Sequence, residues 1–268
     1  MTYESASTFV SRTASPRLLA TKSRAARAVA QKSGLFEVPR VLDVDEATGT
    51  VTFERISGLR PLSNLTGLGN LPGQNACGAL GRSLAVIHRC LRLPHDEARA
   101  LPSPWVKEDE PLVWVHGDLT AANVCCIGDT GRLVIVDWAT AATLGERLTV
   151  ASRYFDVVWF VAHLFYGLPL RRSPALNPAP LARCFLAAYI EESAYEHHQA
   201  GLDHCMREIH TLYPTIVAQR VAAAPPALRI VARRLHAQRY RKWLDFVHSY
   251  NAGAVVDLRD FDRADVNS

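Results

Sequence analysis

The sequence predicts an α+β fold made of two unequal units: a small strand-rich unit first, then a larger and mostly helical one. Three observations lead to this prediction. The chain has 268 residues, of which 49 % are hydrophobic and 21 % charged, so it can bury a sizeable core and is not a disordered chain. Strand-like patterns dominate up to residue 57, whereas helical spacing dominates after residue 152. Between these regions lie one more segment with helical spacing, residues 74–91, and a few short apolar strands.

The first predicted elements are two short strands and a helix. Residues 8–13 and 17–21 are expected to form strands on either side of a turn at 14–16, where a serine and a proline mark the turn. The alanine-rich stretch 23–32 has high helix propensity. Gly34 follows it closely enough to end that helix.

A β-hairpin is predicted to complete the small unit. Residues 38–42 and 50–55 are both rich in strand-forming residues, and the turn-like segment 45–49 separates them. The pattern changes after Gly58, where prolines and glycines become frequent. We therefore predict a first domain over residues 1–57 and a second over residues 58–268, with a ligand bound where the two meet.

The second unit is predicted to combine long helices with a few short strands. Residues 74–91 carry leucine and isoleucine at helical spacing. Three short apolar segments, 112–115, 124–127 and 133–136, read as strands, and the last two flank a strong turn signal at 128–131. Further helices are expected over residues 155–166, 181–192, 202–217 and 227–250.

Composition excludes several classes of protein. The formal net charge of +4 is far too small for a dedicated nucleic-acid binder. No apolar run reaches the length of about 18 residues that a membrane-spanning helix needs. The polar N-terminus lacks the apolar core of a secretory signal, so we expect a cytoplasmic protein. The six cysteines include no CxxC pair, and reduced, mostly buried thiols are expected.

The residues that could carry chemistry gather between positions 113 and 139. His116-Gly117-Asp118 follows one strand, Asn123 precedes the next, and Asp137 ends the third. Phosphoryl transfer needs a carboxylate beside the attacking hydroxyl and oxygen ligands for Mg²⁺ at the nucleotide phosphates. Because strands 124–127 and 133–136 would form one hairpin, Asp118, Asn123 and Asp137 are expected to lie in one small volume.

This segment resembles the catalytic segment of the aminoglycoside phosphotransferase and choline kinase family, the small-molecule relatives of protein kinases. The family pattern is HGD, four residues, N, and then an apolar strand that ends in D-W or D-F-G. Here it stands as His116-Gly117-Asp118, Asn123 and Asp137-Trp138. The resemblance implies a two-lobed protein-kinase-like fold with a reduced N-terminal lobe. It also implies Mg²⁺-dependent transfer of the γ-phosphoryl group of ATP or GTP to a hydroxyl of a small molecule.

The resemblance assigns roles to single residues. Asp118 would orient the acceptor hydroxyl and accept its proton, and His116 would position the loop through hydrogen bonds. Asn123 and Asp137 would hold Mg²⁺. The segment Glu54, Arg55 and Ile56 looks like the family's hinge, which meets the adenine mainly through main-chain groups. In the same way, Asp156 resembles an aspartate that braces the catalytic loop. The acceptor could be an aminoglycoside, another antibiotic, an amino alcohol, a sugar or a nucleoside.

Two departures from the family concern the first unit. No glycine-rich loop precedes residue 38, because Gly34 is the first glycine. Lys22 is the candidate for the strand lysine that reaches the α- and β-phosphates, yet the helix 23–32 carries no acid to pair with it. Lys22 is therefore either a phosphate ligand with another partner or an ordinary surface lysine.

Two further alternatives stay open. The same departures favour a pseudokinase or nucleotide-binding module that keeps the fold without turnover, whereas the intact Asp118, Asn123 and Asp137 favour an enzyme; an enzyme with another donor or transferred group is a weaker option. The basic stretch 215–250 fits either a solvated helix face or a cationic wall for an anionic ligand.

Overall fold

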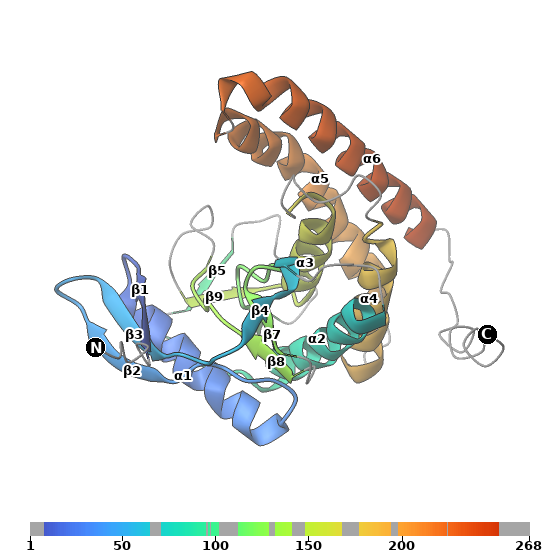
Figure 1. Ribbon diagram of the computed structural model, residues 1–268. Helices are drawn as coiled ribbons and strands as arrows, with labels where there is room; N and C mark the ends of the chain where they lie inside the picture. The colour runs from blue at the N-terminus through green and yellow to red at the C-terminus, as the bar shows by residue number, and fades with distance from the viewer. Residues whose placement is uncertain are drawn as a thin grey trace.

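The computed structural model describes residues 8–64, 71–94, 96, 98–101, 112–128, 132–140, 148–167, 177–193, 198–223 and 225–251. In Figure 1 the N-terminal sheet and helix α1 lie on one side of the molecule and the helices of the second unit on the other, with the short central strands between them. The predicted α+β class, with a small strand-rich unit and a larger helical one, is confirmed.

The N-terminal unit is a three-stranded antiparallel sheet with one helix. Strands β1 (Thr8–Arg12), β2 (Val41–Asp45) and β3 (Thr50–Glu54) lie in the order β1-β3-β2, and α1 (Pro16–Ser33) connects β1 to β2. The predicted hairpin over residues 38–55 is confirmed as the antiparallel pair β2–β3, although β2 begins at Val41.

The predicted strand at residues 17–21 is wrong, because helix α1 begins at Pro16 and includes the whole segment. A proline at the first helical position suits a helix start, since its fixed φ is helical and it has no N–H to leave unpaired. Buried side chains also recur along α1 at helical spacing, which continues the pattern of residues 23–32. Gly34 ends the helix as predicted: it adopts a φ of +70°, and its N–H donates to the carbonyl of Ala30.

A second sheet carries the hairpin that holds the predicted chemistry. Its order is β4-β7-β8, and it consists of β4 (Leu59–Pro61), β7 (Val124–Ile127) and β8 (Arg132–Ile135). The hairpin β7–β8 was predicted, whereas β4 was expected to be loop. Antiparallel pairing with β7 makes β4 a strand, so the chain that leaves the N-terminal unit is anchored directly on this hairpin.

The N-terminal unit also contacts β8 through the segment that follows α1. Glu37 forms a bridge beside Val134: its N–H donates to Leu133 over 2.8 Å, and its carbonyl accepts the N–H of Ile135 over 2.9 Å. Its carboxylate pairs with Arg132. The predicted division into residues 1–57 and 58–268 stays a prediction, and these contacts join the two parts.

The third sheet is built from three short strands that lie far apart in the sequence. β6 (Val113–Trp114) is the predicted strand at 112–115, and it pairs with β9 (Leu148–Ala151), which in turn pairs with β5 (Ala98–Ala100). Neither β5 nor β9 was predicted. β6 leads directly into His116, so this sheet sets the position at which the chain enters the catalytic segment.

Helices form the rest of the second unit and agree with the predicted ones to within three residues at each end, except that α5 is longer at both ends than the predicted 202–217. They are α2 (Leu71–Cys90), α3 (Tyr154–Tyr166), α4 (Ala179–Ser193), α5 (His198–Ala223) and α6 (Arg229–Asn251). Every residue of α3 is buried, which makes it the central helix of this unit. Helices α5 and α6 lie side by side and extend away from the short strands (Figure 1). Within the described residues, none of the helices has the length and apolarity needed to cross a membrane.

Candidate active site

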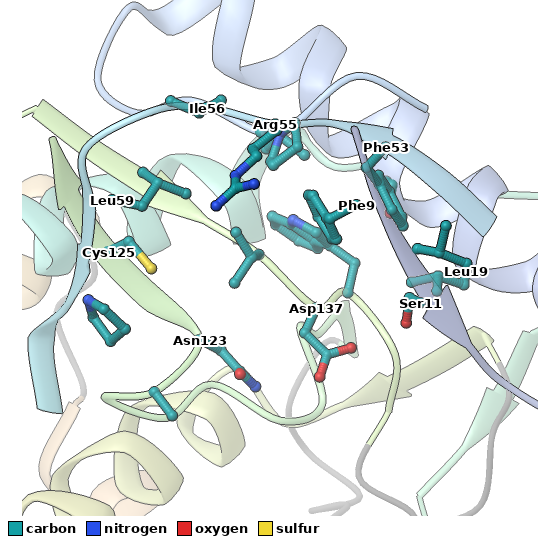
Figure 2. Close-up of a pocket in the computed structure, with 18 of the residues that line it drawn as sticks. Phe9, Ser11, Leu19, Phe53, Arg55, Ile56, Leu59, Asn123, Cys125 and Asp137 are labelled. Carbon is teal, nitrogen blue, oxygen red and sulfur yellow. The ribbon is translucent and has the colours of Figure 1, made fainter. Parts of the chain in front are cut away.

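A cavity of about 1030 Å³ lies between the N-terminal sheet and the β7–β8 hairpin (Figure 2). Phe9, Leu19 and Phe53 give it an apolar wall on the N-terminal side. Asn123 and Asp137 contribute polar side chains on the opposite side. A large cleft with an apolar wall and a few convergent polar groups is typical of a small-molecule site.

The hairpin brings Asn123 and Asp137 to the same cavity. Asn123 directly precedes β7, and its carbonyl accepts the N–H of Val136, so the chain is held beside β8 up to the residue before Asp137. Asp137 itself adopts a φ of +54°, the one positive φ among the described non-glycine residues. Aspartate tolerates this conformation better than most residues, and such backbone outliers concentrate at functional sites.

Asp118 lies beside this pair, with its two carboxylate oxygens held by different donors. The indole Nε1 of Trp159 donates to Oδ1 over 3.2 Å, and the amide Nδ2 of Asn123 donates to Oδ2 over 3.3 Å. Burial raises the pKa of Asp118 to about 6, and the charge of Asp137 acts in the same direction. Both hydrogen bonds oppose that shift because they stabilise the carboxylate. The two donors therefore hold the carboxylate of Asp118 in a fixed orientation close to Asn123.

His116 is arranged to hold the loop in place. Its Nδ1 accepts the N–H of Asp118 over 3.3 Å, so its Nε2 carries the proton and donates to the carbonyl of Val136 over 3.2 Å. Burial lowers the pKa of His116 to about 4. The positive charge of Lys22 also lowers this pKa, whereas the negative charge of Asp156 raises it. The neutral ring thus links the main chain at Asp118 to the carbonyl of the residue before Asp137, and its positioning role stays a prediction.

Asp156 at the start of α3 braces the same loop. Its carboxylate accepts the N–H of His116 over 2.6 Å and the N–H of Gly117 over 2.9 Å. It also pairs with Nε2 of His88, whose Nδ1 lies 3.0 Å from the hydroxyl of Tyr189. Burial raises the pKa of Asp156, but the hydrogen bonds and the nearby histidines outweigh burial and hold the pKa below its usual value. The contacts agree with the brace that the resemblance implied.

Gly117 is required by the shape of this loop. Its φ is +86°, and a Cβ at this position would lie 3.0 Å from Oγ1 of Thr140. A side chain here would therefore meet both backbone strain and a close neighbour.

The predicted hinge residues have different surroundings. Arg55 and Ile56 line the cavity, and Figure 2 shows the guanidinium of Arg55 directed into it. Glu54 is not among the described residues that line the cavity. Its carboxylate accepts hydrogen bonds from the guanidinium of Arg27 over 2.9 Å and from the N–H of Arg40 over 2.8 Å. Glu54 thus ties the hinge to α1 through its side chain.

Lys22 lies where the sequence did not place it. It belongs to α1 rather than to the end of a strand, and its residue is 1 % exposed, which also rules out an ordinary surface lysine. Its Nζ donates to the carbonyl of His116 over 2.6 Å, and it is not among the described residues that line the cavity. From strand β1, Ser11 reaches the cavity instead (Figure 2).

Two residues at the site were not predicted to act there. Trp159 was expected to be core, and it is buried, but its indole N–H also holds Asp118. Its position three residues after Asp156 in a helix puts both on neighbouring turns, which is the signal that could have revealed it. Ser23 is buried and lines the cavity, and its hydroxyl makes no hydrogen bond with the described residues.

The donor set at the cavity suits a hard cation such as Mg²⁺. Asn123 and Asp137 offer an amide and a carboxylate, and both side chains project into the same space (Figure 2). Mg²⁺ is usually held by one or two carboxylates together with water and substrate phosphates. No group of three or more His, Cys, Asp or Glu side chains that could hold a metal occurs among the described residues.

Comparison of the sequence with protein families gives one match over the centre of the chain. Residues 91–200 match the model of APH, the phosphotransferase enzyme family. The matched segment contains the HGD motif, Asn123, Asp137 and Asp156. No curated protein sequence matches the chain.

Solved structures with a similar fold share little sequence with the chain. A choline/ethanolamine kinase family protein from Mesorhizobium loti is 16 % identical with a TM-score of 0.53, over 92 % of this chain and 88 % of that one. Amicoumacin kinase hAmiN, in complex with AMP-PNP, Ca²⁺ and Ami, is 13 % identical with a TM-score of 0.54, over 88 % and 81 %. Glucosamine kinase in complex with glucosamine, ADP and inorganic phosphate is 15 % identical with a TM-score of 0.51, over 90 % and 74 %. At these identities the likeness concerns the fold.

The matched segment is that of a phosphotransferase, and the protein-kinase-like fold is shared with kinases of small molecules. The predicted resemblance to the aminoglycoside phosphotransferase and choline kinase family is confirmed, and the phosphotransferase enzyme family is the one whose pattern the catalytic segment carries.

Proposed function

We propose that the protein transfers the γ-phosphoryl group of ATP or GTP to a hydroxyl of a small molecule in a Mg²⁺-dependent reaction. The observation that carries this proposal is the convergence of Asn123 and Asp137 on one large cavity, with the carboxylate of Asp118 one hydrogen bond from Asn123. The complexes of the two structural neighbours with AMP-PNP and ADP support a nucleotide as donor. The cytoplasm is the location we expect.

The roles of the residues follow from their contacts. Asp118 would accept a hydrogen bond from the acceptor hydroxyl and take its proton, with Trp159 and Asn123 fixing the carboxylate. His116 would hold the loop through its two ring nitrogens. Because the transferred phosphoryl group needs little covalent help, accurate positioning of the acceptor is the main contribution expected of these side chains.

Asn123 and Asp137 would hold Mg²⁺ through the amide oxygen and the carboxylate. The amide nitrogen of Asn123 donates to the carbonyl and to the carboxylate of Asp118, which leaves its Oδ1 as the atom for a cation. Bound Mg²⁺ supplies positive charge that neutralises the phosphate oxygens of the nucleotide. The hinge Glu54, Arg55 and Ile56 would hold the base, with the guanidinium of Arg55 directed into the cavity.

Amino alcohols, amino sugars and aminoglycoside-type antibiotics are the acceptors to test first. The solved structures of similar fold are named for choline or ethanolamine, amicoumacin and glucosamine. The acceptor of this chain is not fixed by a similarity of fold alone, so these compounds define a screening set rather than a substrate.

The metal assignment is tested by calorimetry with ATP and GTP in the presence and absence of Mg²⁺. We expect Mg²⁺ to tighten nucleotide binding by the parent protein, to have no effect on Asp137→Ala, and to have a reduced effect on Asn123→Ala. If both variants respond to Mg²⁺ as the parent does, the assignment of this hairpin fails.

The transfer itself is tested by phosphate incorporation into the screening set. We expect Asp118→Asn to leave nucleotide affinity nearly unchanged and to lower turnover by about a hundredfold or more, as loss of a proton acceptor does. Turnover near the parent value with a true acceptor would remove Asp118 from this role.

A pseudokinase or nucleotide-binding module is the second candidate, and two observations favour it. Helix α1 carries no acidic residue, and among the described residues that line the cavity the sole cation is Arg55 at the hinge. Such a module would bind the Mg²⁺–nucleotide complex without hydrolysing it and without modifying any acceptor. Phosphorylation of one acceptor, abolished by Asp118→Asn, decides for the enzyme.

A further inference from the structure

Lys22 is a lysine in the interior of the protein, which is unusual for this residue type. Its residue is 1 % exposed, in the middle of helix α1. Its Nζ donates a hydrogen bond of 2.6 Å to the carbonyl of His116, which is 94 residues away in the sequence. A buried ammonium is costly unless it is paired, so this position must provide compensating interactions.

Three carboxylates provide that compensation. The negative charges of Asp156, Asp118 and Asp137 all act on Lys22, in that order of strength. Burial lowers the pKa of Lys22 to about 8, and the three carboxylates oppose this shift. The side chain is therefore mainly an ammonium at neutral pH. The same positive charge contributes to the low pKa of His116, which keeps the imidazole neutral.

The carbonyl that Lys22 binds lies at the start of the HGD loop. Asp156 holds the two N–H groups of His116 and Gly117 on that loop, and Lys22 holds the carbonyl between them. The peptide unit that joins His116 to Gly117 is thus hydrogen-bonded at its oxygen by Lys22 and at its nitrogen by Asp156. The next residue along the chain is Asp118.

We propose that Lys22 is a positioning residue of the catalytic loop, which fixes the main chain before Asp118 and balances the carboxylates gathered there. This inference deepens the proposed function, and its kinetic part rests on it. An apolar side chain of similar length would fill the same volume without the cost of burying a charge, so the ammonium is what this role requires. Contact with the nucleotide phosphates is the competing role, and it requires Lys22 to reach a cavity that it does not line.

Lys22→Met is the variant that tests the proposal, because methionine keeps the length and removes both the donor and the charge. The control is Lys32→Met, near the exposed end of the same helix. Loss of a hydrogen bond that involves a charged group is expected to accelerate hydrogen exchange of the His116 and Gly117 amides by about tenfold or more. The control variant should leave both amides unchanged.

Kinetics separate positioning from phosphate binding. With an acceptor in hand, we expect Lys22→Met to lower kcat by about tenfold or more and to change the KM for ATP by less than about threefold. A raised KM for ATP at unchanged kcat, or ATP binding weakened far more than adenosine binding, would assign Lys22 to the phosphates and overturn the proposal.

The exchange measurement does not depend on catalysis. If no acceptor is phosphorylated by the parent protein, the proposed function fails, while the amide protection still decides the role of Lys22. Unchanged protection of both amides in a folded Lys22→Met protein overturns the proposal. Should Lys22→Met fail to fold, Lys22→Leu, which also removes both the donor and the charge, gives the same comparison with the same criterion of faster exchange.

Discussion

Asp156→Asn is a severe test of the brace beneath the HGD loop, because it removes one charge and almost no volume. Asp156 is fully buried, and its carboxylate accepts two main-chain N–H groups at 2.6 and 2.9 Å in addition to its pair with His88. A hydrogen bond to a charged acceptor contributes about 1.5–3 kcal/mol to stability. An asparagine keeps one accepting oxygen and turns an NH₂ group toward a donor. We therefore expect the free energy of unfolding to fall by about 2–4 kcal/mol.

Urea denaturation followed by circular dichroism measures this loss, with Asp245→Asn on an exposed face of α6 as the control. The control should change the free energy of unfolding by less than about 0.5 kcal/mol. A loss below about 1 kcal/mol for Asp156→Asn at neutral pH would refute the brace as a source of stability.

The effect of Asp156→Asn on the free energy of unfolding should also depend on pH. The pKa of Asp156 is lower in the folded protein than the value of about 3.9 expected when the chain unfolds. The charge of Asp156 therefore stabilises the fold fully above that unfolded value, and this contribution disappears as the pH falls through the folded pKa. The difference in unfolding free energy between parent and Asp156→Asn should narrow below about pH 4. A difference that is constant down to the acid limit contradicts this reasoning.

Three other substitutions test single contacts. Gly117→Ala should lower the free energy of unfolding by about 1–3 kcal/mol, because residue 117 has a φ of +86° and a Cβ there would lie close to Thr140. Gly34→Ala should lower it less in the same denaturation assay, because residue 34 has a φ of +70° but open space around it. Trp159→Phe removes the donor to Asp118 and should lower kcat by about tenfold while calorimetry shows unchanged nucleotide affinity. Ser23→Ala should weaken nucleotide binding by about twofold to tenfold and leave stability unchanged, because the hydroxyl has no partner among the described residues. Equal affinity of the Ser23 variant and the parent would take this hydroxyl out of the site.

The sequence was most informative where chemistry and local pattern coincide. The β7–β8 hairpin could be predicted because two apolar runs flank a turn signal, and it brings Asn123 and Asp137 to one cavity as expected. The long helices were predictable from their spacing. Arg17 to Thr21 was misread because the proline was taken as a turn, whereas it starts α1.

Contacts between distant parts of the chain could not be predicted from the sequence. Strands β4, β5 and β9 have three or four residues each, too few to show a period, and they are strands only because a distant segment pairs with them. The partners of Lys22 and Trp159 have the same origin: each bonds to the HGD loop from a helix far away in the sequence. Helical spacing of side chains in the sequence indicates which of them are buried. It does not indicate which group a buried polar atom will bind.

Helix α1 explains how a first unit without a helix acid can still be held on the second. The resemblance implies a lysine on a strand that pairs with an acidic residue on the helix. Here the helix α1 carries the basic residues, and the groups that accept their hydrogen bonds lie on other elements. Arg27 binds the Glu54 carboxylate beside the hinge, and Lys22 binds the HGD loop. Both contacts come from one helix. Helix α1 therefore contacts both the hinge and the HGD loop, and Glu37, shortly after that helix, adds main-chain hydrogen bonds to β8.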